Sequence, residues 1–249
     1  MPKTEILGIL YENTTIGEAA RGLMALAALH EARYVVTANA EIAESCHKDS
    51  ALSEAVSSAD FIAPDGAGVV LASRILGRPL KERVAGYDLA CALLPQIAEA
   101  KMSVYLLGAG EGVAEKAARS MTERYPGLVV AGLHHGFFTD GTAIEAEINA
   151  AAPDFLFVAL GSPKQEFWMH AHRGKLRCGL MMGLGGSIDV FAGVAKRAPD
   201  FFIRLNLEWF YRLLRQPSRL GRMMKLPKYV LRAIWARIFH NERNGIHEG

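Results

Sequence analysis

The sequence predicts an α/β fold: a mainly parallel, Rossmann-like sheet with helices on both faces, plus a C-terminal basic helical appendage. Short apolar runs alternate with segments of helical periodicity over roughly the first two hundred residues, which is typical of strands and helices that alternate along the chain. Several apolar runs end in polar or glycine-rich turns, as strands do at the ligand-binding edge of an open α/β sheet.

Strands are expected where a short apolar run ends at a turn. These runs cover residues 6–10, 34–36, 61–63, 104–107, 128–133, 155–159 and 180–182. Helices are expected where apolar residues recur every three or four positions between those runs. These segments cover residues 16–32, 41–47, 53–59, 87–100, 113–125, 142–151 and 164–172. Because strands and helices alternate, we expect consecutive strands to run parallel and to be buried on both faces.

The chain changes character after residue 196, and we divide it into an α/β domain, residues 1–196, and a helical appendage, residues 197–249. From Arg204 onward, ten Lys or Arg stand against three Glu, a formal charge of +7 in a chain of net charge +2. Residues 205–214 predict an aromatic-rich helix, and residues 227–239 predict an amphipathic helix with an aromatic anchor at Trp235. Such a basic helix is typical of a segment that lies on an anionic membrane surface. Packing on its own domain or on a second subunit gives the same pattern, so homo-oligomerisation stays open.

The composition excludes several classes of protein. With 51% hydrophobic and 22% charged residues, the chain is globular and not disordered. Cys46, Cys91 and Cys178 are far apart and form no CxxC pair, which argues against a disulfide framework or a zinc site and fits a reducing compartment. We see no signal peptide and no run of about 18 apolar residues, so we expect a cytoplasmic protein.

The stretch from residue 60 to residue 89 holds the leading candidate site. Asp65 follows a short strand on a Pro-Asp-Gly turn, which places a carboxylate where α/β sheets bind ligands. Asp65 is therefore a candidate base, and Arg83, on the next tight turn, is a candidate clamp for an anion. The same turn is common in proteins in general, where the Asp often only caps the following helix.

Other strand ends add polar side chains and glycines to the same edge of the predicted sheet. The candidate binding residues there are Thr37, Asn39, Gly108, Gly110, Gln165, Gly185, Gly186 and Asp189. Glycine-rich turns beside helix starts can present backbone N–H groups to phosphate oxygens, which predicts a nucleotide-diphosphate crevice. Asn39 is alternatively a cap for the helix that begins near Glu41. The GAGEG turn resembles a dinucleotide fingerprint, but Val113 stands where that fingerprint needs glycine.

Seven segments in collinear order carry a resemblance to a known family. They are TANAEI (37–42), PDGAGVV (64–70), ERVAGYDL (82–89), HHGFFT (134–139), GSPKQE (161–166), GVAKRAP (193–199) and LEWFYRLLRQPSR (207–219). Together they resemble the WecG/TagA/CpsF glycosyltransferases, family 26. HHGFFT and MMKLPKYV (223–230) are most similar to the TagA-type members, the N-acetylmannosaminyltransferases of wall teichoic acid linkage-unit synthesis.

The resemblance implies an inverting, metal-independent transfer of N-acetylmannosamine (ManNAc) from UDP-ManNAc to the 4-hydroxyl of GlcNAc on undecaprenyl diphosphate, with no cofactor. It implies that Asp65 is the base, that Asp189 lies near the uridine, and that residues 1–196 form the catalytic domain. It also implies two sets of residues: Thr37, Asn39 and Gln165 in the donor or acceptor pocket, and Arg83, Arg212, Arg219 and Arg222 at the diphosphate. The expected partners are a UDP-sugar, a polyprenyl diphosphate lipid and the inner face of the cell membrane, where the protein would be peripheral.

Alternatives to this function stay open at this point. The same fold and mechanism can serve UDP-ManNAcA (the uronate) or a UDP-hexose in the synthesis of another cell-surface polysaccharide. The GAGEG turn leaves an NAD-binding oxidoreductase as an alternative of a different class. A nucleic-acid partner is not expected, because the basic residues cluster with apolar anchors and lack a recognition motif.

Overall fold

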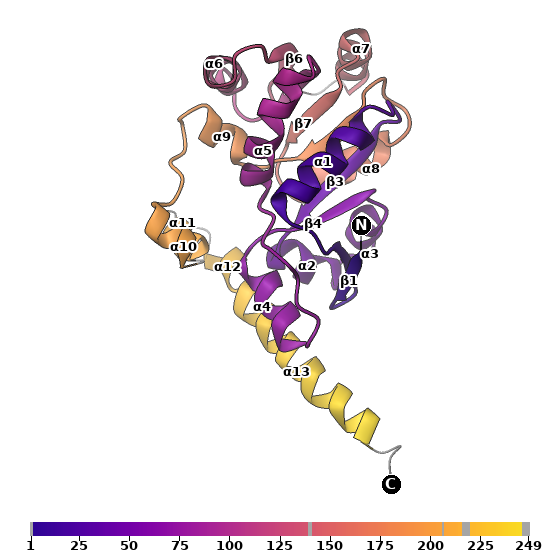
Figure 1. Ribbon diagram of the computed structural model, residues 1–249, viewed down its shortest axis with the longest axis vertical. Coiled ribbons are helices and arrows are strands. Elements are labelled where there is room, and N and C mark those ends of the chain that lie inside the picture. The colour runs from indigo at the N-terminus through magenta and orange to yellow at the C-terminus, as the bar shows by residue number, and fades with distance from the viewer. Residues whose placement is uncertain (1, 139–140, 206, 216–219, 246–249) are drawn as a thin grey trace.

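The computed structural model describes residues 2–138, 141–205, 207–215 and 220–245. Its centre is a six-stranded parallel sheet with the strand order β4-β3-β8-β7-β5-β6 (Figure 1). The strands are β3 (Arg33–Ala38), β4 (Phe61–Pro64), β5 (Ser103–Gly108), β6 (Val129–His134), β7 (Phe155–Ala159) and β8 (Leu180–Gly183). The predicted α/β class and the parallel sheet are thus confirmed.

Helices cover both faces of this sheet, because successive strand residues point to opposite sides and both sides are apolar. One face packs on α1 (Ile16–Ala27), α5 (Gly86–Glu99), α6 (Val113–Arg124) and α9 (Ser187–Phe191). The other face packs on α2 (Ala40–Cys46), α3 (Ser50–Ser57), α4 (Ala67–Ile75), α7 (Gly141–Ala151) and α8 (Lys164–His172). Val35 belongs to the first core and Val36 to the second, which shows the alternation within a single strand.

Two predictions near the N-terminus are wrong in detail. Residues 6–10 do not form one strand, because the chain reverses at Leu7 and Gly8, both with positive φ, between β1 (Lys3–Ile6) and β2 (Ile9–Glu12). Two consecutive residues with positive φ are typical of the tight turn of a β-hairpin. The predicted helix 16–32 ends at Ala27, since the chain then takes positive φ values at His30 and Ala32 and enters β3.

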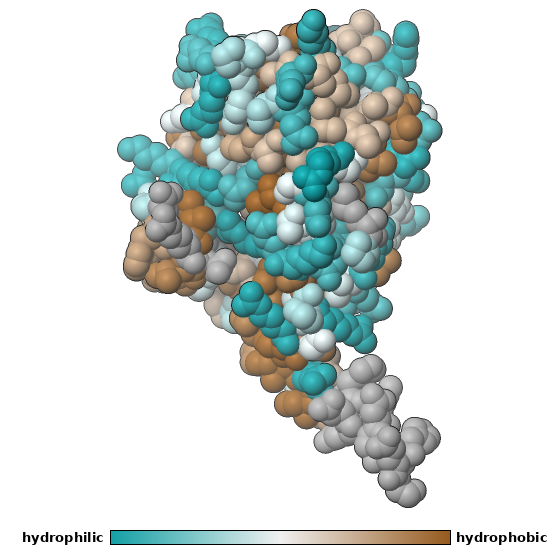
Figure 2. Space-filling view, viewed as in Figure 1, coloured by the Kyte–Doolittle hydropathy of each residue, from teal (hydrophilic) through white to brown (hydrophobic). Residues whose placement is uncertain are grey.

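The C-terminal segment forms α10 (Asp200–Arg204), α11 (Glu208–Arg215), α12 (Leu220–Met223) and α13 (Lys225–Gly245). The first half of α13 packs against α2 and α4, and Tyr229 and Ala233 are fully buried there. Its other face exposes Leu231, Trp235 and Ile238, and the helix continues beyond the body of the molecule (Figure 1). Figure 2 shows apolar side chains gathered along this face of α13 and over α10 and α11. One helix therefore both completes the core and presents an apolar surface.

Within the described ranges, no helix combines the length and the apolar character that crossing a membrane requires. The division of the chain after residue 196 stays a prediction. In the structure α13 contacts the α/β body over its first turns, so the body and the appendage share one core.

Candidate active site

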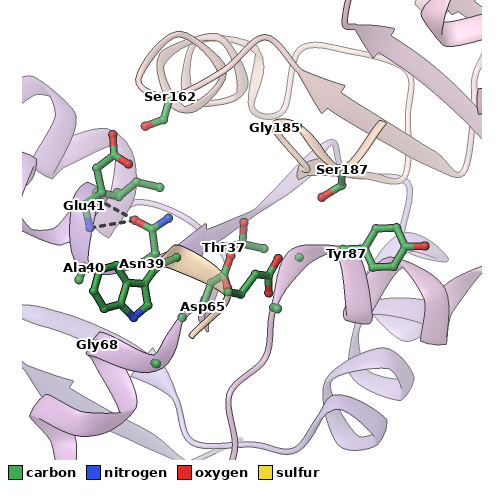
Figure 3. A pocket seen from close by; sticks show the side chains of 18 of the residues that line it. Thr37, Asn39, Ala40, Glu41, Asp65, Gly68, Tyr87, Ser162, Gly185 and Ser187 are labelled. Atoms are coloured by element: carbon green, nitrogen blue, oxygen red, sulfur yellow. Dashed lines mark hydrogen bonds between the residues drawn. The ribbon is translucent and has the colours of Figure 1, made fainter. Parts of the chain in front are cut away.

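A pocket of about 260 Å³ opens at the carboxyl ends of β3, β4 and β8 (Figure 3). The α/β body supplies its floor and walls, and α11, α12 and α13 contribute Glu208, Trp209, Met223 and Leu226. The predicted site residues that line it are Thr37, Asn39, Asp65, Arg83, Gln165, Gly185 and Gly186. These residues come from distant parts of the sequence, and the parallel sheet brings them together because its strands all end at the same edge.

Asp65 enters the pocket directly after β4. Its backbone N–H donates to the carbonyl oxygen of Ala38, which ties the ends of β3 and β4 together. The N-cap position of α4 is Gly66, with a φ of 86°. Asp65 thus stands one residue before the N-cap position, and its carboxylate lines a cavity that can hold a proton donor.

Thr37 and Asn39 both support the pocket from the end of β3. Thr37 Oγ1 donates to the carbonyl oxygen of Gly183 at 3.2 Å, which joins β3 to β8. Asn39 Oδ1 accepts from the backbone N–H groups of Glu41 and Ile42, at 2.9 and 3.0 Å (Figure 3). The capping interpretation of Asn39 is confirmed. Asn39 also lines the pocket, so a structural role and a binding role are compatible.

Arg83 lies in a network of charged side chains at one wall of the pocket. Its guanidinium contacts Asp88 Oδ2 and Glu208 Oε2, each at 3.3 Å, and its side chain is only 16% exposed. Arg197 contacts the second oxygen of Asp88 at 2.5 Å and stacks over the ring of Tyr87, with 4.8 Å between the guanidinium carbon and the ring centroid. Two arginines are thus held beside the cavity by two carboxylates, and one of these carboxylates comes from the appendage.

At the start of α8, Gln165 lines the pocket and its neighbour Glu166 is fully buried beside it. Gln165 Oε1 accepts from the backbone N–H of Gly185 at 3.1 Å, and its Nε2 donates to Glu166 Oε1 at 2.9 Å. Burial raises the pKa of the Glu166 carboxyl, against the opposing effect of the hydrogen bond from Gln165. Glu166 stands in the GSPKQE segment, which follows β7.

Several predicted residues do not line this pocket. Gly108 lies at the end of β5 with a φ of 125°, and a Cβ there would come within 2.4 Å of the carbonyl oxygen of Ala159. Close approach of two strands therefore explains this glycine without a phosphate. The carbonyl oxygen of Gly110 accepts from the N–H of Val113 at the start of α6, and that of Asp189 accepts from two N–H groups after α9.

The predicted arginines of the appendage cannot be assigned to the pocket. Arg212 belongs to α11 and Arg222 to α12, but their side chains, like the whole of Arg219, lie outside the described part of the structure. Sequence reasoning missed Arg197, Asp88 and Glu208, although all three stand in segments that carried the family resemblance. In the described ranges, no three His, Cys, Asp or Glu side chains gather in a way that could hold a metal ion.

Comparisons with known proteins agree with the resemblance seen in the sequence. Residues 4–243 match the model of the family described as "Glycosyl transferase WecG/TagA/CpsF family". A Bacillus spizizenii protein named N-acetylglucosaminyldiphosphoundecaprenol N-acetyl-beta-D-mannosaminyltransferase is 45% identical over 79% of this chain and 77% of its own length. Relatives with the same name from Bacillus subtilis and Staphylococcus aureus are 43% and 38% identical, and the latter alignment covers 92% of this chain and 91% of the relative.

Proposed function

We propose a specific sugar transfer for this chain, which belongs to the WecG/TagA/CpsF family of glycosyl transferases. It moves ManNAc from UDP-ManNAc to the 4-hydroxyl of GlcNAc on undecaprenyl diphosphate and inverts the anomeric centre, without a metal ion. The names of its relatives support the sugar and the acceptor. The observation that carries the proposal is the pocket that gathers Asp65, Thr37 and Arg83 at one edge of the parallel sheet.

Asp65 is the base in this proposal. The acceptor hydroxyl attacks C1 of ManNAc while the bond from C1 to the oxygen of the β-phosphate breaks, so that UDP leaves with the electron pair. The attacking oxygen loses its proton to the Asp65 carboxylate, and a positioned carboxylate typically accelerates such a step by about 10² to 10⁴-fold. A single displacement of this kind yields the β-linked disaccharide from an α-linked donor.

Arginines stabilise the negative charge that grows on the diphosphate. Arg83 lines the pocket, and Arg212, Arg219 and Arg222 of the appendage are proposed to join it around the phosphates. A guanidinium keeps its charge and offers a planar set of donors, which suits phosphate oxygens. Loss of one preorganised donor commonly costs on the order of 3 kcal/mol of transition-state stabilisation.

The charges around the pocket favour a neutral donor sugar over ManNAcA. Among the described residues that line the pocket, the cations are Arg83 and Arg197, and both already contact carboxylates. Glu41, Asp65 and Glu208 also line the pocket and add negative charge. The carboxylate of ManNAcA would meet these like charges, which disfavours its binding relative to ManNAc.

The appendage places the enzyme at the lipid acceptor. The exposed face of α13 carries Leu231 and Trp235, both 65% exposed, next to basic residues of the same helix. A helix of this kind binds at the boundary between headgroups and acyl chains of an anionic bilayer. We propose that the protein is peripheral on the inner face of the cell membrane, with its pocket close to the acceptor diphosphate.

A transfer assay tests this function. A GlcNAc-diphosphate lipid analogue is offered with UDP-ManNAc or UDP-ManNAcA, in parallel, with EDTA present. The expected result is a disaccharide lipid from UDP-ManNAc that persists in EDTA. Product from UDP-ManNAcA alone would contradict the proposed donor, and product that disappears in EDTA would contradict the metal-independent mechanism.

A further inference from the structure

Glu166 lies behind the wall of the pocket and does not line it. Its side chain is 0% exposed, whereas its neighbours Gln165 and Ser162 do line the cavity. Glutamate is almost never fully buried unless it is paired, because the interior solvates a carboxylate poorly. No Lys, Arg or His contacts Glu166 among the ion pairs of the described residues, so a salt bridge does not account for its position.

The hydrogen bonds around Gln165 require a single orientation of its amide. A side-chain amide has nearly the same shape when its oxygen and nitrogen are exchanged, so packing alone does not distinguish the two orientations. The Glu166 carboxylate accepts from Nε2 at 2.9 Å, and the Gly185 N–H donates to Oε1 at 3.1 Å. In the opposite orientation an oxygen would face a carboxylate and an NH₂ group would face an N–H donor. Both contacts would then be repulsive.

The orientation of this amide affects the floor of the pocket. A Cβ on Gly183 would come within 2.9 Å of Gln165 Nε2 and 3.0 Å of Met169 Cε, so the amide packs closely over the end of β8. The carbonyl oxygen of Gly183 accepts the hydrogen bond from Thr37, and Gly185 forms the next turn, with a φ of 51°. A continuous set of contacts therefore runs from Glu166 through Gln165 to the strand end that supports Thr37.

We propose that Glu166 is a positioning residue: by accepting from Gln165 Nε2, it fixes the Gln165 amide and, through Gly185, the wall of the sugar-transfer pocket. This inference rests on the proposed function of the pocket. A carboxylate serves this purpose better than an amide because it only accepts hydrogen bonds, whereas an amide could present either atom to Gln165. On this proposal, burying the Glu166 carboxylate costs folding stability but holds the pocket wall in the defined geometry that a preorganised site requires.

The test compares Glu166→Met and Glu166→Gln with the control Glu12→Gln. Glu12 is also a buried glutamate, 4% exposed with one oxygen that lacks a hydrogen-bond partner among the described residues, but it lies on β2 outside the pocket lining. Glu166→Met keeps the volume and removes a buried charge, which often leaves stability unchanged or raises it. We expect an unchanged or higher Tm for Glu166→Met, and a kcat that falls by about tenfold because the wall shifts. The control should keep its kcat.

A double-mutant cycle with Gln165→Ala shows whether Glu166 acts through Gln165. In the Gln165→Ala background, Glu166→Gln is expected to lower kcat no further. An equal loss in both backgrounds would overturn the inference, and so would a kcat for Glu166→Met that equals the wild-type value. A merely structural role would instead make kcat follow Tm across the variants.

Hydrogen exchange at the Gly185 amide provides a readout that does not depend on the reaction. We expect faster exchange in Glu166→Met than in the wild type, and unchanged exchange in Glu12→Gln. If the wild type makes no disaccharide, the proposed function fails, yet the exchange measurement still decides the role of Glu166. Unchanged protection of Gly185 in Glu166→Met would overturn that role whatever the enzyme transfers.

Discussion

Replacing Asp65 by Asn should stop turnover while the fold and donor binding persist. Asn keeps the shape of the side chain but cannot accept the proton of the acceptor hydroxyl. Because the N-cap position of α4 is Gly66 and Asn keeps the shape of the side chain, we expect a stability change within about 0.5 kcal/mol. Loss of a general base lowers kcat by about 10² to 10⁴-fold, or about 3 to 5 kcal/mol of transition-state stabilisation.

The assay measures kcat for disaccharide formation, the Kd of UDP-ManNAc by calorimetry and the Tm of each variant. Asp49→Ala is the matched control, because Asp49 does cap α3 by accepting from the Leu52 N–H at 3.0 Å. The control should lose about 1 kcal/mol of stability and keep its kcat. A tenth or more of wild-type turnover in Asp65→Asn would refute the base assignment, and lost donor binding with an unchanged Tm would place Asp65 in the donor site instead.

Three further predictions concern the appendage. Glu208→Gln removes an ion pair with Arg83 whose two side chains are only 16% and 15% exposed, which leaves the Arg83 charge more available to the diphosphate, so the affinity for UDP measured by calorimetry should rise about fivefold. Unchanged or weaker UDP binding would contradict a phosphate-binding role for Arg83. Tyr229→Ala should lower the free energy of unfolding in urea by about 3 kcal/mol, because the Tyr229 ring is fully buried, whereas Trp235→Ala, at an exposed position, should leave that free energy unchanged and weaken liposome binding. The reverse pattern would refute the assignment of one face of α13 to the core and the other to the membrane. Burial acts to raise the pKa of the Glu44 carboxyl, but hydrogen bonds from Arg232 and Lys228 of α13 hold this pKa below its ordinary value of 4.5. The ionised carboxylate should therefore stabilise the fold fully above pH 4.5, and this stabilisation should be lost as the pH falls through the lowered pKa; Tm measured against pH should show that Glu44→Gln removes this part of the pH dependence.

Much of the central sheet could be predicted because its strands are buried on both faces and read as continuous apolar runs. The residues 155–159 run is an example, since it is predicted and observed with the same ends. The N-terminal hairpin could not be predicted in this way, because residues 6–10 also form a continuous apolar run apart from Gly8. Only the positive φ at Leu7 and Gly8 separates one strand from two, and the apolar pattern carries no signal for it.

The sequence could predict the site residues that directly follow a strand, but not the contacts that form between segments far apart in the chain. Asp65 and Thr37 follow strands directly, so the topology of a parallel sheet brings them together. The ion pair of Arg83 with Glu208 joins residues 125 positions apart, and no local pattern indicates it. Gly108 shows that a glycine typical of a phosphate turn can also be required by the close approach of another strand, here β7.

The amphipathic pattern of residues 227–239 left membrane binding and packing on the domain as alternatives, and the structure shows why it could not separate them. The apolar residues of α13 divide into two sets, because Tyr229 and Ala233 are buried against the body while Leu231 and Trp235 face outward. A sequence pattern reports apolar positions on a helix but not which of them another element covers.

The linkage of the disaccharide tests the central claim most directly. NMR of the product made from UDP-ManNAc and the GlcNAc-diphosphate lipid analogue determines both the anomeric configuration and the acceptor oxygen. A single displacement with Asp65 as base predicts a β-linked ManNAc on the 4-oxygen of GlcNAc. An α-linked product would require retention at C1, and would contradict both the proposed mechanism and the role of Asp65.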